Sequence, residues 1–177
     1  MKAISPELKG VSIMDSSISG LYTGTNEKSQ NYSSGGYHVD KSMLKHDKEK
    51  GTYKEDGYSK NPTAIYINDA IVDGKIVVDG KVANGQFTYV VDTNGNLIIG
   101  RRNGSVKFQT PHPSLIGGKD PIVKMAGMVD IRNGKIHSWD DRSGHFKPNI
   151  KSMKYADEAF GKLSKEIFVK DFNKGKK

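Results

Sequence analysis

Short apolar runs separated by glycine, asparagine and aspartate occupy the middle of the chain. Between residues 64 and 139 these runs are rich in β-branched and aromatic side chains, which favour strands. Turn residues recur about every 8 to 12 positions, which is the spacing of an antiparallel meander. The pattern therefore predicts strands at residues 64–67, 75–78, 86–91, 97–100, 105–109, 125–131 and 135–139.

The turn Arg132-Asn133-Gly134 joins the last two predicted strands. Asn-Gly is the strongest two-residue hairpin signal, because both central residues of a type I′ turn need positive φ. Pairing of the two arms brings the segments that lie outside them to the same end of the sheet. His112 precedes one arm and His145 follows the other, so we expect both histidines at that end.

An apolar stripe with helical spacing follows the last strand. Its members are three and four residues apart, the period of one helix face, and they are Met153, Ala156, Phe160, Leu163, Ile167 and Phe168. Asn149 or Ser152 can cap this helix, and Asp157 and Glu158 lie near its start, where negative charge is favourable. A shorter helix is predicted over residues 41–50, with Asp40 as N-cap and Gly51 as stop.

These elements define an α+β fold class that is mainly antiparallel β. The strands form a meander, a twisted sheet or a partly closed barrel, with one C-terminal helix and a short N-terminal helix. Residues 1–36 are rich in serine, glycine, asparagine and threonine, which predicts a flexible arm or linker. Residues 37–170 form a single globular domain, and residues 171–177 form a basic tail.

Composition narrows the chemistry that the chain can perform. The 177 residues carry a net charge of +8, which suits a polyanionic partner such as nucleic acid, or an acidic protein. The chain has no cysteine, so disulfides, thiolate catalysis and cysteine-based zinc sites are excluded. It has no apolar run of about 18 residues and no signal-peptide pattern, so no membrane partner is expected.

Two polar motifs around the hairpin supply the main catalytic hypothesis. His112 and His145 can act as an acid–base pair, because imidazole titrates near neutral pH, and Lys147 can stabilise a developing anion. Metal-free ribonucleases need such a set, so the pattern predicts metal-independent cleavage of RNA. No metal site is predicted, because no histidine pair has helical i, i+4 spacing. Substrate phosphates would meet hydroxyl and guanidinium groups of the same region, namely Ser114, Ser143, Arg102 and Arg142.

Two alternatives stay open. His38 on an early strand, Tyr66 on a later one and a late carboxylate from Asp140 or Asp141 are the pieces of an ADP-ribosyltransferase that uses NAD as cofactor. In the other alternative, the chain is a non-catalytic binding module and the histidine motifs are turn chemistry. A ribonuclease needs no cofactor, a transferase releases nicotinamide from NAD, and a binding module does neither.

Several motifs between residues 87 and 148 resemble, in the same order, a segment of plant IQ-motif calmodulin-binding proteins and C-terminal modules of bacterial polymorphic toxins of the Rhs or contact-dependent type. These motifs cover about a third of the chain and comprise residues 89–92, 97–100, 108–109, His112, 114–117, 126–127, 133–135, 143–146 and Pro148. The resemblance implies an interbacterial toxin effector that is secreted or injected into a target cell and has a cognate immunity protein. The chain lacks an IQ-type helix, so calmodulin binding is not expected.

Overall fold

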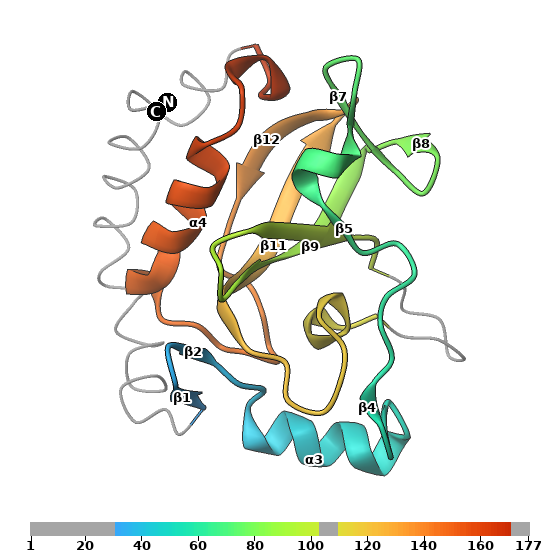
Figure 1. Ribbon diagram of the computed structural model, residues 1–177, viewed down its shortest axis with the longest axis vertical. Helices are drawn as coiled ribbons and strands as arrows, with labels where there is room; N and C mark the ends of the chain where they lie inside the picture. The colour runs from blue at the N-terminus through green and yellow to red at the C-terminus, as the bar shows by residue number, and fades with distance from the viewer. Residues whose placement is uncertain (1–30, 103–109, 171–177) are drawn as a thin grey trace.

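The computed structural model describes residues 31–102 and 110–170, and these form a mixed α+β fold around one antiparallel sheet (Figure 1). This confirms the predicted fold class, and the sheet stays open rather than closing into a barrel. Along the sheet the strands are β1 (Tyr32–Ser33), β2 (Gly36–Tyr37), β11 (Val123–Arg132), β9 (Gly85–Asp92), β10 (Leu97–Gly100) and β5 (Ile65–Tyr66), and β12 (Lys135–Trp139) pairs with β11.

The hairpin between β11 and β12 forms as the sequence predicts. Asn133 and Gly134 both have positive φ, 50° and 81°, as a type I′ turn requires. Pairing of Arg132 with Lys135 closes the turn. The first arm begins at Val123, two residues earlier than predicted, and its length lets it pair with β2, β9 and β12.

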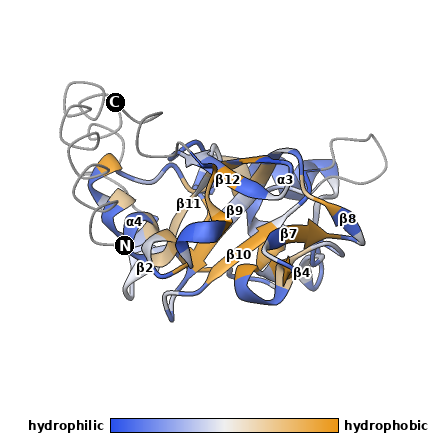
Figure 2. Ribbon diagram, turned by 90° about the horizontal axis from the view of Figure 1, so that it is seen from above, coloured by the Kyte–Doolittle hydropathy of each residue, from blue (hydrophilic) through white to orange (hydrophobic). Residues whose placement is uncertain are grey.

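Alternating side chains give the sheet two buried faces. On β9, Phe87, Tyr89 and Val91 pack in the core beneath helix α4, whereas Val90 belongs to a second core on the opposite face. The central strands β10 and β11 are largely hydrophobic, while most loops are hydrophilic (Figure 2). Both faces therefore have apolar side chains that must be shielded from solvent, and the two helices lie on opposite faces.

Helix α4 (Met153–Gly161) covers the first face but is shorter than predicted. The apolar stripe is buried throughout, yet Ile167 belongs to the 3₁₀ turn η4 (Lys165–Ile167) rather than to the helix. Gly161 is a poor helix former, and the chain after η4 runs extended beside β12, with Phe168 opposite Ile136. The prediction of acidic residues at the helix start is also wrong, because Met153 begins the helix and its first turn contains no acidic residue.

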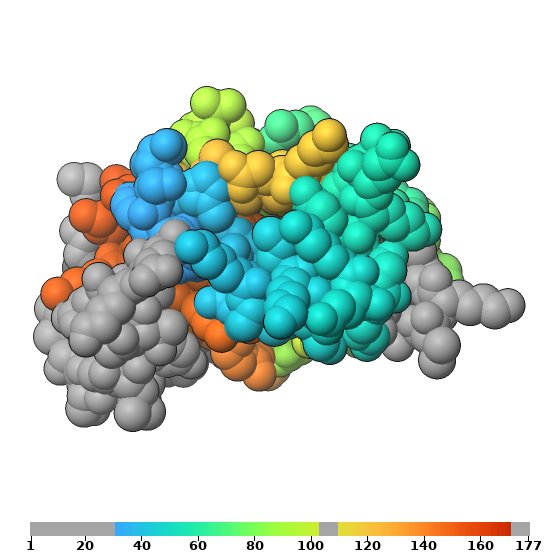
Figure 3. Space-filling model, turned by 90° about the horizontal axis from the view of Figure 1, so that it is seen from below, coloured from blue at the N-terminus to red at the C-terminus, as the bar shows by residue number. Residues whose placement is uncertain are grey.

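Helix α3 (Lys41–Lys50) lies against the second face, at the bottom of Figure 1, and its outer side is visible in Figure 3. The predicted caps are confirmed. The Asp40 carboxylate accepts hydrogen bonds from the Ser42 and Met43 backbone N–H groups at 3.1 and 3.3 Å, and Gly51 adopts the left-handed conformation with φ 87°. Met43 and Leu44 pack on the second core, while the lysines of the helix face solvent.

Two small sheets accompany the main one. β3 (Tyr53–Lys54) pairs with β4 (Gly57–Tyr58), and β6 (Ile71–Val72), β7 (Lys75–Val78) and β8 (Lys81–Val82) form a three-stranded sheet. The prediction of a single sheet is therefore wrong for residues 75–78, which pair with their own neighbours. Residues 67–70 form the 3₁₀ turn η1 (Ile67–Ala70) instead of extending β5. The predicted strand 105–109 lies outside the described residues.

The folded part extends further toward the N-terminus than the predicted boundary at residue 37. β1 pairs with β2, and Asn31 is buried, with its side-chain amide donating to the Phe146 carbonyl at 2.8 Å. Residues 31–36 thus belong to the domain, and the remainder of the predicted arm and the basic tail lie outside the described residues. Within residues 31–102 and 110–170, no helix has the length and apolarity needed to span a bilayer.

Candidate functional site

A cleft of about 340 Å³ opens on the α3 face of the sheet, and we call it the histidine cleft. Strands β9 and β11 contribute to its lining, and α3 contributes one side chain. The remaining lining residues are Arg102, which follows β10, and residues 111–112 and 142–145. Its apolar lining residues are Met43, Pro111, Met128 and Gly144. Its polar lining residues are Gln86, Thr88, Arg102, His112, Arg142, Ser143 and His145.

His112 begins the 3₁₀ turn η2 (His112–Leu115), between two prolines that restrict the backbone. Its Nε2 lies 2.7 Å from the Gly127 carbonyl of β11, and the residue is only 6% exposed. A carbonyl oxygen can only accept, so Nε2 carries the hydrogen and donates it. The neutral ring therefore offers Nδ1 as a hydrogen-bond acceptor.

The environment of His112 keeps this ring neutral. Burial is the largest cause, and with a smaller contribution from the positive charges of His145 and Arg102 it lowers the pKa of His112 from 6.5 to about 4. His112 is thus an uncharged proton acceptor at neutral pH, although its neighbours in the cleft are cationic or can become so.

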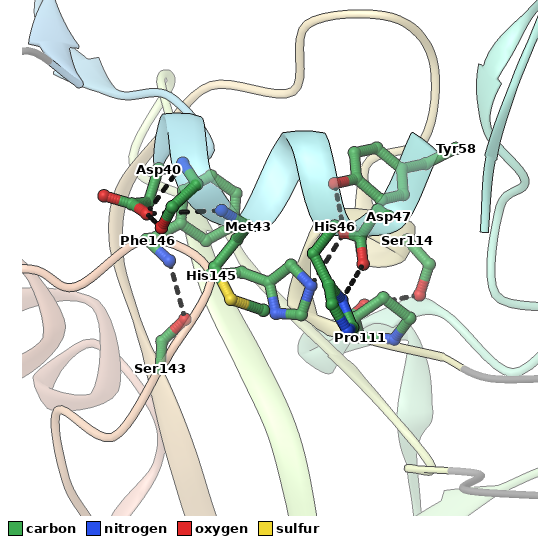
Figure 4. Close-up of polar contacts among 11 residues, drawn as sticks. Asp40, Met43, His46, Asp47, Tyr58, Pro111, Ser114, Ser143, His145 and Phe146 are labelled. Carbon is green, nitrogen blue, oxygen red and sulfur yellow. Dashed lines mark hydrogen bonds and ion pairs between the residues drawn. The ribbon is translucent and has the colours of Figure 1, made fainter. Parts of the chain in front are cut away.

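His145 is held by a buried carboxylate that comes from α3. Its Nε2 lies 2.9 Å from Asp47 Oδ2, and the same oxygen accepts a hydrogen bond of 2.5 Å from the Tyr58 hydroxyl (Figure 4). The Asp47 side chain is 6% exposed and that of His145 is 16% exposed. Burial alone would raise the pKa of Asp47, but the hydrogen bonds from His145 and Tyr58 hold it below its usual value. Asp47 is therefore a carboxylate, and it leaves Nδ1 of His145 for a ligand.

A close approach of two backbones positions the segment that carries Arg142, Ser143 and His145. After β12 the chain crosses β11 at Gly127, where an added Cβ would lie 1.9 Å from the Asp140 carbonyl oxygen. Tyr89 donates its hydroxyl to the same oxygen at 2.6 Å, and the Met128 N–H donates to the Asp140 carboxylate at 2.9 Å. The absence of a side chain at Gly127 thus permits the crossing that brings the two histidine motifs together.

Two arginines supply positive charge in the histidine cleft. The Arg142 guanidinium is fixed by Asp140, with Nε 2.6 Å from Oδ2, and by Gln86, with Nη2 3.1 Å from Oε1. Nη1 is then available to a ligand. Arg102 is exposed, and no carboxylate among the described residues pairs with it. The pair can therefore bind an anion such as a phosphate.

Not every residue of the catalytic hypothesis lies in this cleft. His112, His145, Ser143, Arg102 and Arg142 line it, but Lys147 and Ser114 do not. The Lys147 ammonium lies 3.4 Å from the Asp40 carboxylate at the start of α3. The Ser114 hydroxyl is buried and donates to the Pro111 carbonyl at 2.6 Å, which stabilises η2.

The residues of the ADP-ribosyltransferase alternative are dispersed. His38 follows β2 and contacts Asp120, with Nδ1 2.7 Å from Oδ1, whereas Tyr66 belongs to β5 and is exposed. Strands β11, β9 and β10 lie between β2 and β5 in the sheet. Tyr66 lines a different hollow beside α4, and Asp140 is engaged with Arg142. These side chains do not share a cleft.

Sequence reasoning missed Asp47, Gln86 and Met43. Asp47 lies one helical turn after Met43, on the side of α3 that packs inward, so its register indicates a buried carboxylate but not the partner that it binds. Gln86 precedes the buried Phe87 on β9, so its side chain lies on the opposite face of the strand. It lines the cleft because residues 140–145, the segment that crosses β11, lie beside it.

No protein-family model, curated protein or solved structure matches the chain. Within the described ranges, no group of three or more histidine, aspartate or glutamate side chains is arranged to hold a metal ion.

Because the pKa of His112 is low, the free energy of unfolding is expected to decrease as the pH is lowered. A histidine with a depressed pKa in the folded state contributes fully above its unfolded value of 6.5, and this contribution is lost as the pH falls toward 4. We expect the wild type to lose about 2 kcal/mol between pH 7 and pH 5 from this residue alone. Urea unfolding at several pH values measures the loss.

The His112→Gln variant tests this assignment, because its amide can still donate to Gly127 but does not titrate. Its free energy of unfolding should fall less steeply with acidification than that of the wild type. His137→Gln, which replaces a half-buried histidine outside the histidine cleft, is the matched control for the substitution itself. Equal slopes for the wild type and His112→Gln would contradict the neutral, buried state of His112.

Proposed function

We propose that the chain is a metal-independent ribonuclease whose active site is the histidine cleft. One observation carries the proposal: two imidazoles with different fixed environments, a neutral one bound to a carbonyl and one paired with a carboxylate, line the same cleft as two arginines. General acid–base catalysis needs one group that accepts a proton and one that donates it. In this proposal Arg102 and Arg142 supply the positive charge in place of Lys147, which lies outside the cleft.

The reaction consistent with these groups is transfer within the RNA backbone. His112 Nδ1 accepts the proton of a ribose 2′-hydroxyl, and the 2′-oxygen attacks the adjacent phosphorus. The bond from phosphorus to the 5′-oxygen breaks, and His145 donates a proton from Nδ1 to that oxygen. The products are a 2′,3′-cyclic phosphate and a free 5′-hydroxyl, while Arg102 and Arg142 stabilise the charge on the phosphorane.

Substrate binding makes His112 a better base than its resting pKa suggests. Burial is the main reason for the low pKa, but the charges of His145 and Arg102 contribute. A phosphate in the cleft brings negative charge next to both cations and offsets their effect on His112. The proton affinity of His112 therefore rises when the substrate phosphate is bound.

The biological setting of the proposal is that of an interbacterial toxin effector. The resemblance of the segment 87–148 to polymorphic toxin modules supports this setting, and the basic charge suits RNA as target. In this setting the protein is secreted or injected and is neutralised by a cognate immunity protein.

Incubation of the purified protein with labelled RNA in EDTA tests the activity. We expect cleavage products that end in a 2′,3′-cyclic phosphate, and no cleavage where a single 2′-deoxynucleotide replaces the ribose at the cut site. Cleavage of that deoxy substrate, or cleavage only with added Mg²⁺, would contradict the mechanism. Release of nicotinamide from NAD without RNA cleavage would support the transferase alternative instead.

Asp47→Asn should slow cleavage by about 10- to 100-fold with a KM within about threefold of the wild type. The amide no longer compensates the charge on His145, although it keeps a similar shape, and orienting partners of catalytic groups have effects of at least this size. Steady-state kinetics on a short RNA measures both constants. Asp130→Asn, which alters a partly exposed carboxylate paired with Arg132 and His137, is the matched control and should leave both constants unchanged.

A further inference from the structure

We infer that the histidine cleft admits one unpaired nucleotide, so that single-stranded RNA is the substrate and duplex RNA is excluded. This inference rests on the proposed ribonuclease activity and specifies its substrate class. It follows from the depth of the imidazoles, the size of the cleft and the side chains at its walls.

The two imidazoles are recessed below the surface. His112 is 6% exposed and the His145 side chain is 16% exposed, yet both line the cleft. Proton transfer requires hydrogen-bond contact between each ring and the RNA backbone. The ribose and phosphate at the cut site must therefore enter the cleft, because side chains of this depth cannot reach outward.

The cleft has the dimensions of a small-ligand site. Its volume of about 340 Å³ lies at the lower end of the range for pockets that enclose one small organic molecule, about 300 to 1,000 Å³. A single nucleotide is such a group, whereas a base pair is not. Figure 4 shows Met43 of α3 beside His145, and Met128 of β11 also lines the cleft, so apolar thioethers are available to contact a base.

Gln86 adds a polar contact that an unpaired base can use. Its side-chain carbonyl accepts a hydrogen bond from Arg142, which leaves its amide N–H groups to donate. An unpaired base presents free carbonyl or ring-nitrogen acceptors on its Watson–Crick edge, whereas a paired base has already used them. The arrangement thus favours a nucleotide that has left its stack.

Duplex RNA cannot present its backbone in this way. In an A-form helix the 2′-hydroxyls lie along a wide, shallow minor groove, and the bases are stacked inside. To reach recessed groups, a nucleotide would have to leave the helix, at the cost of unpairing and unstacking. That cost is smaller for a single strand, which has no base pairs to break.

The test uses one RNA sequence in three forms: single-stranded, annealed to its full complement, and annealed to a complement that leaves one nucleotide bulged. We expect the single strand to be cut about 100-fold faster than the perfect duplex, given the cost of extruding a paired nucleotide. We also expect the bulged duplex to be cut at its bulge. All three substrates are assayed with the full chain in EDTA.

The outcomes separate the two proposals. If the perfect duplex is cut within about tenfold of the single strand, or if the bulge is not the preferred cut site, the inference is overturned while the ribonuclease activity stands. If none of the three substrates is cut, the ribonuclease proposal fails, and the inference fails with it.

Discussion

Replacing His145 by glutamine should lower the rate of RNA cleavage by about 10³-fold, in line with the loss of a general acid. The effect is large because in the proposed mechanism His145 donates the proton to the leaving oxygen, while burial keeps His112 neutral at physiological pH. Glutamine retains a donor for the buried Asp47, so the helix contact at 2.9 Å is replaced rather than deleted. Single-turnover cleavage of a short RNA measures the rate.

A matched control separates catalysis from folding. His137→Gln alters a histidine on β12 outside the histidine cleft, and it should cleave RNA at the wild-type rate. Urea unfolding checks that both variants are folded at the assay temperature. A folded His145→Gln protein with a rate within about fivefold of the wild type would remove His145 from the mechanism and leave the acid unassigned.

Gly127→Ala should destabilise the protein by about 3 kcal/mol or more, the upper end of the cost of overpacking a core. The new methyl group would lie 1.9 Å from the Asp140 carbonyl oxygen and 2.9 Å from the Tyr89 ring. Both neighbours are held, since Tyr89 is fully buried and donates to that carbonyl. The crossing segment must therefore move away, and the hydrogen bond from His112 to the Gly127 carbonyl is disturbed as well.

Gly144→Ala provides the comparison for this variant. Gly144 lies in the same crossing segment, but an added Cβ there meets no atom within 4 Å. Its free energy of unfolding should lie within about 0.5 kcal/mol of the wild type. Equilibrium unfolding in urea compares the two variants, and similar values for both would show that the Gly127 crossing is not a tight contact.

Local signals predicted the parts of the fold that depend on neighbouring residues. The Asn133-Gly134 turn and the caps Asp40 and Gly51 are correct because turn and cap chemistry involves residues only a few positions apart. The C-terminal helix is too long in the prediction because burial of Ile167 on the sheet produces the same spacing in a non-helical segment. Periodicity alone does not distinguish the two.

Only the part of the candidate site that follows from the pairing of two strands could be predicted from the sequence. His112 and His145 lie on either side of the hairpin, which predicts that they meet at one end of the sheet, and both residues line one cleft. Asp47 could not be assigned to that site, because 98 residues separate it from His145 and no local pattern encodes their contact. Lys147 has a positive φ of 45°, and its ammonium lies beside Asp40 rather than in the cleft, which adjacency to His145 did not reveal.

The attachment of His145 to α3 has a consequence for biosynthesis. Helix α3 and its N-cap hold both the backbone and the side chain of His145. The Asp40 N–H donates to the His145 carbonyl at 2.7 Å, and Asp47 binds the His145 ring. The helix leaves the ribosome first, and its partner residue emerges 98 residues after Asp47. The proposed active site therefore cannot form until His145 has been made, and a product truncated before residue 145 is expected to lack the proposed ribonuclease activity.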